Sequence, residues 1–365
     1  MVVYVRKEKL GNISYLNSFV ELSLPSNLGS NDFIKITNYP CKALLSAPLT
    51  ITINITDKCN FSCGFCYFKK GKTTLTYKQI DLLIKYIKDK CIYEVDILGG
   101  EPLFPKVAKK TTYLINKLLK IASVKRVYLS TNGSFLNESL YKLLSNKKIE
   151  LSISLEGIKR DHELLTKSTS FGKVKRNILN LDNKTEIKYT ITTVINKLNR
   201  ENLNLFYGSF LVKLNNLKCW LWHYPTIVAY NKNFSDNVMG LKKFYNLVET
   251  FRKKTPDLLI VDAPYNYLFS NSNVPTSKLE KVLCMCKGKY KKIEIMPDGE
   301  AYPCALLRFE KYNLGSIDKG FKYSPNKISL RNSCSNNGCK YWNVCYGCLG
   351  YKLANGDDPR CPEYK

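Results

Sequence analysis

The sequence contains no run of about 18 apolar residues, which is close to the shortest length that lets a helix cross a bilayer. Its first residues, MVVYVRKEKLGN, also lack the apolar segment of a secretory signal. These absences argue against a membrane-spanning protein and against an exported one. We therefore expect a cytoplasmic chain that has no membrane partner.

Acidic residues are scarce as well, since 30 Asp and Glu stand against 57 Lys and Arg in 365 residues. The formal net charge of +27 fits either an anionic partner or a composition that is simply rich in Lys, Asn, Ile and Tyr. The lysines are spread along the whole chain, which favours the second explanation. No RNA-binding appendage is recognisable, so nucleic acid is not an expected partner.

Cysteine, by contrast, is abundant, with 14 residues that are distributed unevenly. A disulfide scaffold is not expected in a cytoplasmic chain of this size. Cys41, Cys91 and Cys219 stand alone and are predicted to be small buried apolar residues. The others form two groups, which favours metal binding: Cys59, Cys63 and Cys66, and then Cys284, Cys286, Cys304, Cys334, Cys339, Cys345, Cys348 and Cys361.

Apolar, β-rich segments alternate with amphipathic helical segments over residues 49–224. The strand segments are 49–55, 94–100, 125–131, 149–155, 186–194 and 217–224, and helices are expected at 76–90, 109–122 and 240–254. This rhythm predicts an α/β fold in which parallel strands are covered by helices on the outside. Six such units are too few for a closed eight-stranded barrel, so we expect a partial (β/α)6 TIM-like barrel.

Four parts of the chain are expected from composition. Residues 1–45 form an N-terminal capping segment, in which VVYVRKE and FVELSL are predicted to pair as a hairpin. The partial barrel occupies 46–235, and a helix and linker follow at 236–283. Residues 284–365 form a small Cys-rich domain with few large apolar side chains, so we expect it to need metal for its stability.

The first cysteine group has the spacing C-x3-C-x2-C and comes directly after the first predicted strand. A zinc finger instead uses paired C-x2-C elements and a fourth ligand. Three thiolates in one loop suit three irons of a 4Fe-4S cluster and leave the fourth iron open to a non-protein ligand. The loop lies at the carboxyl end of the barrel strands, where active sites of such folds are found.

This spacing in this place resembles the signature of the radical SAM superfamily. Phe65 precedes the last cysteine and Tyr67 follows it, and the resemblance implies that both contact the adenine of S-adenosyl-L-methionine. The family chelates the open iron with the methionine amino and carboxylate groups. One electron, from a donor such as ferredoxin or flavodoxin, then splits the sulfonium and yields a 5′-deoxyadenosyl radical that abstracts hydrogen from substrate.

Further motifs follow the next strands in the order that the family has them. Gly99 and Gly100 allow a close backbone approach, and Glu101 can pair with an ammonium group, which the resemblance identifies as the methionine amino group. In STNG and SISLEG, the resemblance places Ser130, Asn132 and Ser154 around the ribose and carboxylate.

Two motifs depart from the family pattern. Glu156 stands where the family often has Asp. Relatives often carry HDxxR after it, whereas this chain retains His162 but has Glu163 in place of the Asp and Thr166 at the position of the arginine that helps to hold the SAM carboxylate. Lys167 and Arg160 are the candidates to replace that arginine.

Residues 286–361 resemble the SPASM extension, with IMPDGEAYPC and the cysteines that follow as the closest matches. The resemblance implies two auxiliary 4Fe-4S clusters in this iron–sulfur domain. The nearer would use Cys304 and Cys348 with Cys286, Cys284 or both, and the outer would use Cys334, Cys339, Cys345 and Cys361. One or two zinc sites are the alternative.

SPASM relatives mostly modify ribosomally made peptides or proteins, so we expect a peptide or protein substrate and a crosslinking or oxidative maturation reaction. The alternative is a tetrapyrrole-modifying enzyme of an alternative haem pathway. Ala305 follows Cys304 where sulfatase-maturing relatives have an Asp that serves as base, which argues against that subclass. No catalytic base is assigned, because a structural role for His223 is equally plausible.

Overall fold

The computed structural model describes residues 3–6, 33–36, 50–255, 258–262, 292–322 and 349–355. At the N-terminus, β1 (Val3–Arg6) pairs antiparallel with β2 (Phe33–Ile36). The first half of the predicted hairpin is therefore a strand, but its described partner is β2. The segment FVELSL lies outside the described residues.

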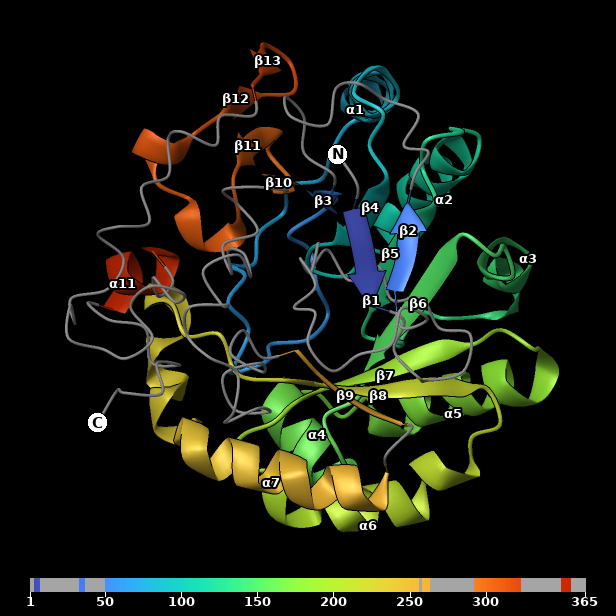
Figure 1. Ribbon diagram of the computed structural model, residues 1–365, viewed down its shortest axis with the longest axis vertical. Coiled ribbons are helices and arrows are strands. Elements are labelled where there is room, and N and C mark those ends of the chain that lie inside the picture. Colours follow the sequence, from blue (N-terminus) through green and yellow to red (C-terminus); the bar gives the residue numbers. More distant parts are fainter. Residues whose placement is uncertain are drawn as a thin grey trace.

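The main sheet curves through the molecule as an open barrel wall (Figure 1). Its order is β13-β12-β11-β10-β3-β4-β5-β6-β7-β8-β9, and the eight strands from β10 to β9 run parallel. These are β10 (Lys292–Ile295), β3 (Thr50–Asn54), β4 (Glu94–Leu98), β5 (Arg126–Thr131), β6 (Ile149–Ser154), β7 (Tyr189–Val194), β8 (Leu217–His223) and β9 (Leu259–Asp262). The partial-barrel prediction is confirmed, and β3 to β8 are the six predicted strands.

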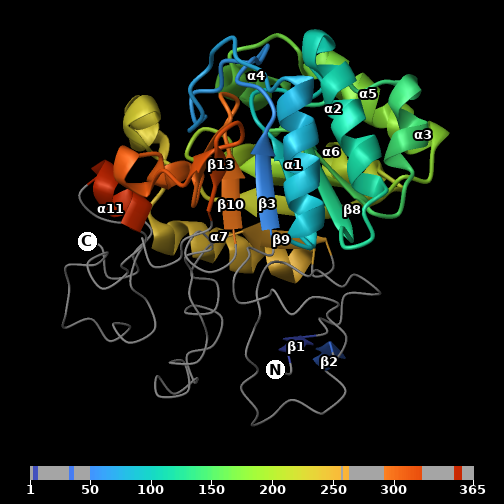
Figure 2. The ribbon, with the colours of Figure 1, turned by 90° about the horizontal axis from the view of Figure 1, so that it is seen from above.

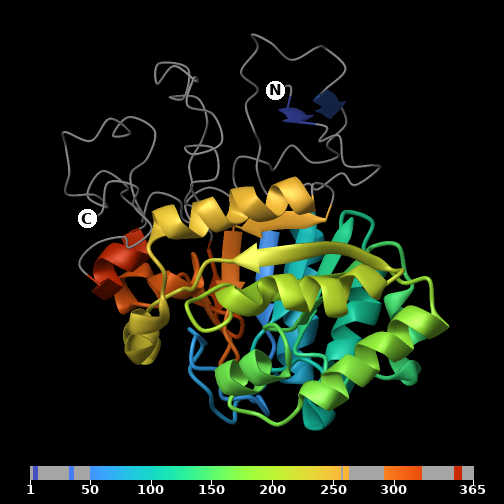
Figure 3. The ribbon, with the colours of Figure 1, turned by 90° about the horizontal axis from the view of Figure 1, so that it is seen from below.

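Helices cover the convex side of this sheet, and α7 lies along the edge formed by β8 and β9 (Figures 1 and 3). They are α1 (Tyr77–Asp89), α2 (Pro105–Leu119), α3 (Tyr141–Leu144), α5 (Phe171–Lys184), α6 (Leu203–Ser209) and α7 (Leu241–Lys254), with α4 (Lys159–Thr166) and α11 (Leu349–Asn355) besides. Thr76 begins α1 with a capping box to Gln79, and Ile80, Leu83 and Ile87 form its buried stripe. Within the described residues, no helix is long and apolar enough to span a membrane.

Two parallel strands were not expected. Strand β9 begins inside the segment that composition assigned to the linker, and β10 lies inside the predicted Cys-rich domain. Each has four residues, which is too short for a periodicity to stand out. Strand β10 pairs with β3, and its Ile293 and Ile295 are fully buried in the barrel core. Residues 292–322 therefore gain a core from the barrel, which the expectation of a purely metal-held domain did not include.

The part of residues 292–322 that follows β10 packs against α1. Strands β11 (Glu300–Tyr302), β12 (Gly315–Ser316) and β13 (Gly320–Phe321) extend the sheet in antiparallel fashion. The ring of Phe321 packs on Tyr86 with centroids 4.4 Å apart, and Gln79 donates to Asp318 at 2.8 Å. The start of the C-terminal region is thus continuous with the barrel.

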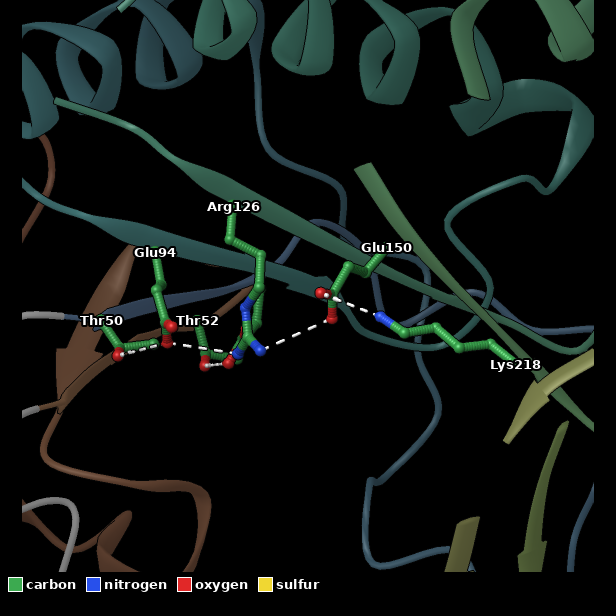
Figure 4. Close-up of polar contacts among 7 residues, drawn as sticks. Thr50, Thr52, Glu94, Arg126, Glu150 and Lys218 are labelled. Atoms are coloured by element: carbon green, nitrogen blue, oxygen red, sulfur yellow. Dashed lines mark hydrogen bonds and ion pairs between the residues drawn. The ribbon is translucent and has the colours of Figure 1, made fainter. Parts of the chain in front are cut away.

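The inward-facing side chains at the amino ends of the strands are polar (Figure 4). Arg126 lies between two carboxylates, at 3.2 Å from Glu94 and 3.5 Å from Glu150, and Lys218 also approaches Glu150 at 3.5 Å. Positive and negative groups alternate in this network, although burial still raises the pKa of Glu94 to about 7. The network lies at the end of the barrel opposite the cysteine loop, so the functional groups are to be sought at the carboxyl end.

Candidate active site

The three cysteines of the first group lie in the loop between β3 and α1. An isolated bridge between Thr56 and Thr74 closes the base of this loop. Its middle is bound to the end of α4, because Ser62 N donates to Thr166 O at 2.9 Å and Gly64 N donates to Leu165 O at 3.0 Å. Figure 2 shows this loop, in blue, beside α4 at one edge of the molecule. The loop is therefore held from two sides.

His162 on α4 supports the same loop. Its ring packs edge-on against Phe61, with centroids 5.8 Å apart, and its Nδ1 accepts a hydrogen bond of 3.3 Å from Glu156 N. Burial lowers the pKa of His162 to about 4, so the imidazole is neutral near pH 7. The side chain of Thr166 turns back to donate to the carbonyl of His162 at 2.7 Å. The retained histidine thus helps to orient the cysteine loop through its contact with Phe61.

The thiols themselves are half-buried. Burial raises the pKa of Cys59, Cys63 and Cys66, and for Cys63 the neighbouring Cys66 raises it further. Within the described part of the chain, no three His, Cys, Asp or Glu side chains are already grouped as metal ligands. Three neutral thiols in one anchored loop nevertheless fit a 4Fe-4S cluster by donor type, since binding would convert them to thiolates.

The backbone conformation and close packing after β4 explain why residues 99 and 100 are glycines. Gly99 has a φ of +134°, and a Cβ on Gly100 would lie 2.2 Å from the carbonyl oxygen of Lys58. The backbone here passes directly under the cysteine loop, with Gly100 N donating to Thr56 O and Glu101 N donating to Lys58 O, both at 2.7 Å. The close approach that the sequence predicted is thus made to the cysteine loop itself.

Glu101 is fully buried at the centre of this arrangement. Its Oε1 accepts from Thr131 Oγ1 at 2.6 Å and from Leu103 N at 2.9 Å, and its Oε2 accepts from Asn132 N at 2.7 Å. Burial raises the pKa of Glu101 to about 7 in spite of these donors. An ammonium group nearby would favour the ionised form. The role of Thr131 was missed, although it lies inside the quoted STNG motif.

Asn132 connects the end of β5 to the cysteine loop. Its Nδ2 donates to Asn60 Oδ1 at 2.9 Å and lies 3.8 Å from the sulfur of Cys59. Asn60 in turn donates to Ser134 Oγ at 3.0 Å. The structure therefore brings Glu101 and Asn132 together with Cys59, while Ser130 and Ser154 are half-buried at the carboxyl ends of the adjacent strands β5 and β6.

The aromatic residues of the loop have partners that the sequence did not reveal. Phe65 packs on Phe234 with ring centroids 6.0 Å apart, and its carbonyl accepts from Asn231 Nδ2 at 2.8 Å. Both partners come from the 3-10 helix Ala229–Asn237, which has no sequence period that would announce it. Tyr67 is half-buried in the same loop.

Glu156 and the two candidate replacements for the family arginine, Arg160 and Lys167, lie in different surroundings. Glu156 is buried, accepts from Val194 N at 2.8 Å, and has its pKa raised to about 8 by burial. Arg160 is bound to Asp161 at 2.9 Å, and Lys167 is exposed in a left-handed conformation after α4. Neither cation is buried in the site.

The remaining cysteines are only partly described. Cys304 is half-buried at the start of the 3-10 helix Ala305–Leu307. Cys219 is buried as predicted, whereas Cys91 is half-buried in a left-handed conformation at the end of α1. The other predicted ligands of the second group and Cys41 lie outside the described residues: Cys284, Cys286, Cys334, Cys339, Cys345, Cys348 and Cys361.

The chain thus combines an open parallel barrel with a three-cysteine loop at the carboxyl ends of its strands. Residues 53–207 match the family model of the Radical SAM superfamily. The family implies a 4Fe-4S cluster and S-adenosylmethionine as cofactors.

Similarity to individual proteins extends beyond this domain. The chain is 24% identical to the cysteine-type anaerobic sulfatase-maturating enzyme of Clostridium perfringens, over 87% of this chain and 90% of that protein. It is 25% identical to GTP 3',8-cyclase of Aquifex aeolicus, over 71% and 83% of the two chains.

Solved structures share the fold. Streptococcus suis SuiB bound to S-adenosylmethionine superimposes with a TM-score of 0.71 at 19% identity, covering 86% of this chain and 76% of that one. The anSMEcpe structure with bound AdoMet gives a TM-score of 0.63 at 21% identity, with 82% and 88% covered. The fold similarity thus includes proteins crystallised with the expected cofactor.

Proposed function

We propose that this chain is a radical SAM enzyme that cleaves S-adenosylmethionine reductively and abstracts hydrogen from a ribosomally made peptide or protein. The observation that carries the proposal is the cysteine loop, which Glu101, Asn132 and α4 hold at the open end of the barrel. The similarity to a sulfatase-maturating enzyme over nearly the whole chain supports a peptide or protein substrate. So does the fold shared with SuiB, which has been solved with its precursor peptide SuiA.

The proposed roles follow the geometry. Cys59, Cys63 and Cys66 would hold the cluster, which when bound supplies the single electron that cleaves the sulfonium. Glu101 would pair with the amino group of S-adenosylmethionine, because its carboxylate lies beneath the cysteine loop and its Oε2, which accepts only one of the three hydrogen bonds, keeps one acceptor site.

The other proposed contacts surround that carboxylate. Phe65 and Tyr67 would contact the adenine from the loop. Ser130, Asn132 and Ser154 would bind the ribose and carboxylate from the strand ends. Of these, Asn132 is the best supported, since its side chain lies beside Cys59.

The C-terminal region is proposed to carry two auxiliary 4Fe-4S clusters on the eight cysteines from Cys284 to Cys361, within a SPASM domain at 284–365 that follows the barrel at 46–235. Its first strands share the barrel sheet, which would keep such clusters close to the active site. Zinc on the same cysteines is the competing possibility, and an iron and zinc analysis separates the two.

The reaction is proposed to be a crosslink or an oxidation of the substrate other than sulfatase maturation. Ala305 has no acid–base group, and its backbone N–H donates to Glu294 Oε2 at 2.7 Å. A tetrapyrrole substrate has no specific observation in its favour.

The test is anaerobic reconstitution followed by measurement of 5′-deoxyadenosine with dithionite as reductant. We expect the wild-type chain to form it and Cys63→Ala to form none, while Cys219→Ala, which changes a buried thiol on β8, retains activity. Unchanged 5′-deoxyadenosine formation by Cys63→Ala would refute the proposal.

A further inference from the structure

Two partly exposed aromatic side chains lie beside the cysteine loop. Phe104 precedes α2 and Phe135 follows β5, and their rings meet edge to face with centroids 5.5 Å apart. The ammonium group of Lys173, on α5, lies 4.8 Å from the centre of the Phe135 ring. Aromatic residues are enriched at protein interfaces, and the lysine makes a cation–π contact with one of the two rings.

Three lysines follow Phe104 within the first two turns of α2. Lys106 and Lys109 are exposed in the first turns of α2, and Lys110 binds the carbonyl of Leu75 at 2.7 Å, which places α2 against the cysteine loop. The first turn of α2 contains no acidic residue, and positive charge there opposes the helix dipole. Helix stability therefore does not explain these lysines.

The same lysines have no acidic partner in the described part of the chain. The ion pairs found there use other cations, on β5, β8, β10, α4, α5, α7 and the turn before α6. Phe104 and Phe135, together with Lys106, Lys109 and Lys173, therefore form a positive surface with a small aromatic centre.

A short connection leads from this surface to the first cysteine. Phe135 follows Ser134, whose hydroxyl accepts a hydrogen bond of 3.0 Å from Asn60, and Asn60 is the residue directly after Cys59. Asn132 makes a second connection, since its amide contacts both Asn60 and the Cys59 sulfur. An electron that enters at Phe135 would need to cross only one hydrogen bond and a few covalent bonds to reach Cys59.

We propose that Phe104, Phe135, Lys106, Lys109 and Lys173, here called the Phe–Lys surface, dock an acidic one-electron carrier protein. One electron leaves the flavin or iron–sulfur centre of the carrier, which is oxidised by one electron, and reduces the cluster that Cys59 would help to hold. No atom or proton is transferred. The inference rests on the proposed function, because it requires that cluster.

An acidic substrate peptide could use the same charges. The connection to Cys59 favours the carrier, since a substrate has no need of a route to a cluster ligand. Charge attraction of this kind acts mainly on the association rate and weakens with salt.

The test compares two double variants of α2. Lys106→Glu with Lys109→Glu reverses the charge of the Phe–Lys surface, and Lys117→Glu with Lys120→Glu makes the same change at exposed positions at the other end of this helix region. Stopped-flow spectroscopy measures the reduction of the reconstituted enzyme by flavodoxin hydroquinone or by reduced ferredoxin, at low and high salt.

We expect the first variant to reduce the second-order rate constant by about tenfold or more at low salt, and less at high salt, while the control stays within about twofold of wild type. Dithionite, which needs no docking, should support equal 5′-deoxyadenosine formation in all three proteins. The proposal would be overturned if both double variants were reduced by the carrier with the same rate constant. It would also be overturned if neither flavodoxin nor ferredoxin reduced the wild-type enzyme in a saturable manner. If the wild-type enzyme formed no 5′-deoxyadenosine with dithionite, the proposed function itself would be refuted.

Discussion

The backbone N–H of Asn132 donates a hydrogen bond of 2.7 Å to Oε2 of Glu101, so a buried carboxylate joins the ends of β4 and β5. The side chain of Asn132 then reaches up to Asn60 in the cysteine loop. Glu101 therefore supports the loop through the very residue that lies beside Cys59.

Glu101→Gln should weaken both stability and cofactor binding. The new NH2 group must face at least one buried donor among Thr131, Leu103 and Asn132, which costs about 1–3 kcal/mol of unfolding free energy. Loss of the negative charge should also weaken S-adenosylmethionine binding by about tenfold or more. Thermal unfolding and calorimetric titration of the reconstituted protein measure the two effects. Glu138→Gln, at an exposed position, is the control, and an unaltered affinity in Glu101→Gln would exclude the proposed ammonium contact.

Gly100→Ala should displace the cysteine loop. The added methyl group would lie 2.2 Å from Lys58 O, so the backbone on one side must move, at a cost of about 1–3 kcal/mol. We expect loss of most of the iron held by the first cysteine group. Iron analysis and thermal unfolding test this against Gly172→Ala on α5, where the new methyl group meets nothing within 4 Å. Full iron content in Gly100→Ala would show that the loop tolerates the movement.

Glu156 should make the metal-free protein less stable as pH rises. Its pKa is raised to about 8 in the folded chain by burial, so the folded state binds a proton that the unfolded state has released. The stabilisation is complete below pH 4.5 and is lost as pH increases to about 8, with a slope near 1.4 kcal/mol per pH unit in between. Glu156→Gln should remove this slope. Urea unfolding at several pH values is the measurement, and Glu186→Gln, which is exposed, should leave the slope as it is. If the free energy of unfolding depended on pH in the same way in wild type and Glu156→Gln, the raised pKa of Glu156 would not be the cause of the slope.

The sequence predicted the six strands from β3 to β8 because each combines β-branched residues with a flanking amphipathic helix. It did not predict β9 or β10, because four-residue strands are stabilised by pairing with β8 and β3 and have little periodicity of their own. Site residues could be predicted where they belong to a short contiguous motif, as Glu101 does in GGEP. The contact of Asn231 with Phe65 was not, since it joins residues 166 positions apart through one side-chain amide.

Cys304→Ala should lose auxiliary iron and keep the first cluster. Cys304 begins the 3-10 helix Ala305–Leu307, which is tied to the barrel by the hydrogen bond from Ala305 N to Glu294. Glu294 lies on β10 and also accepts from Asn54 on β3 at 2.8 Å, and Ile293 and Ile295 of the same strand are buried in the core. None of these contacts uses the Cys304 side chain, so the fold around Cys304 should survive the substitution. We expect about twelve iron and twelve sulfide per wild-type chain, about eight in Cys304→Ala, and undiminished 5′-deoxyadenosine formation with dithionite. Cys219→Ala should keep all of its iron. A wild-type content of about four iron with one or two zinc would mean that the C-terminal cysteines form zinc sites, and electrons from the substrate would then need another acceptor.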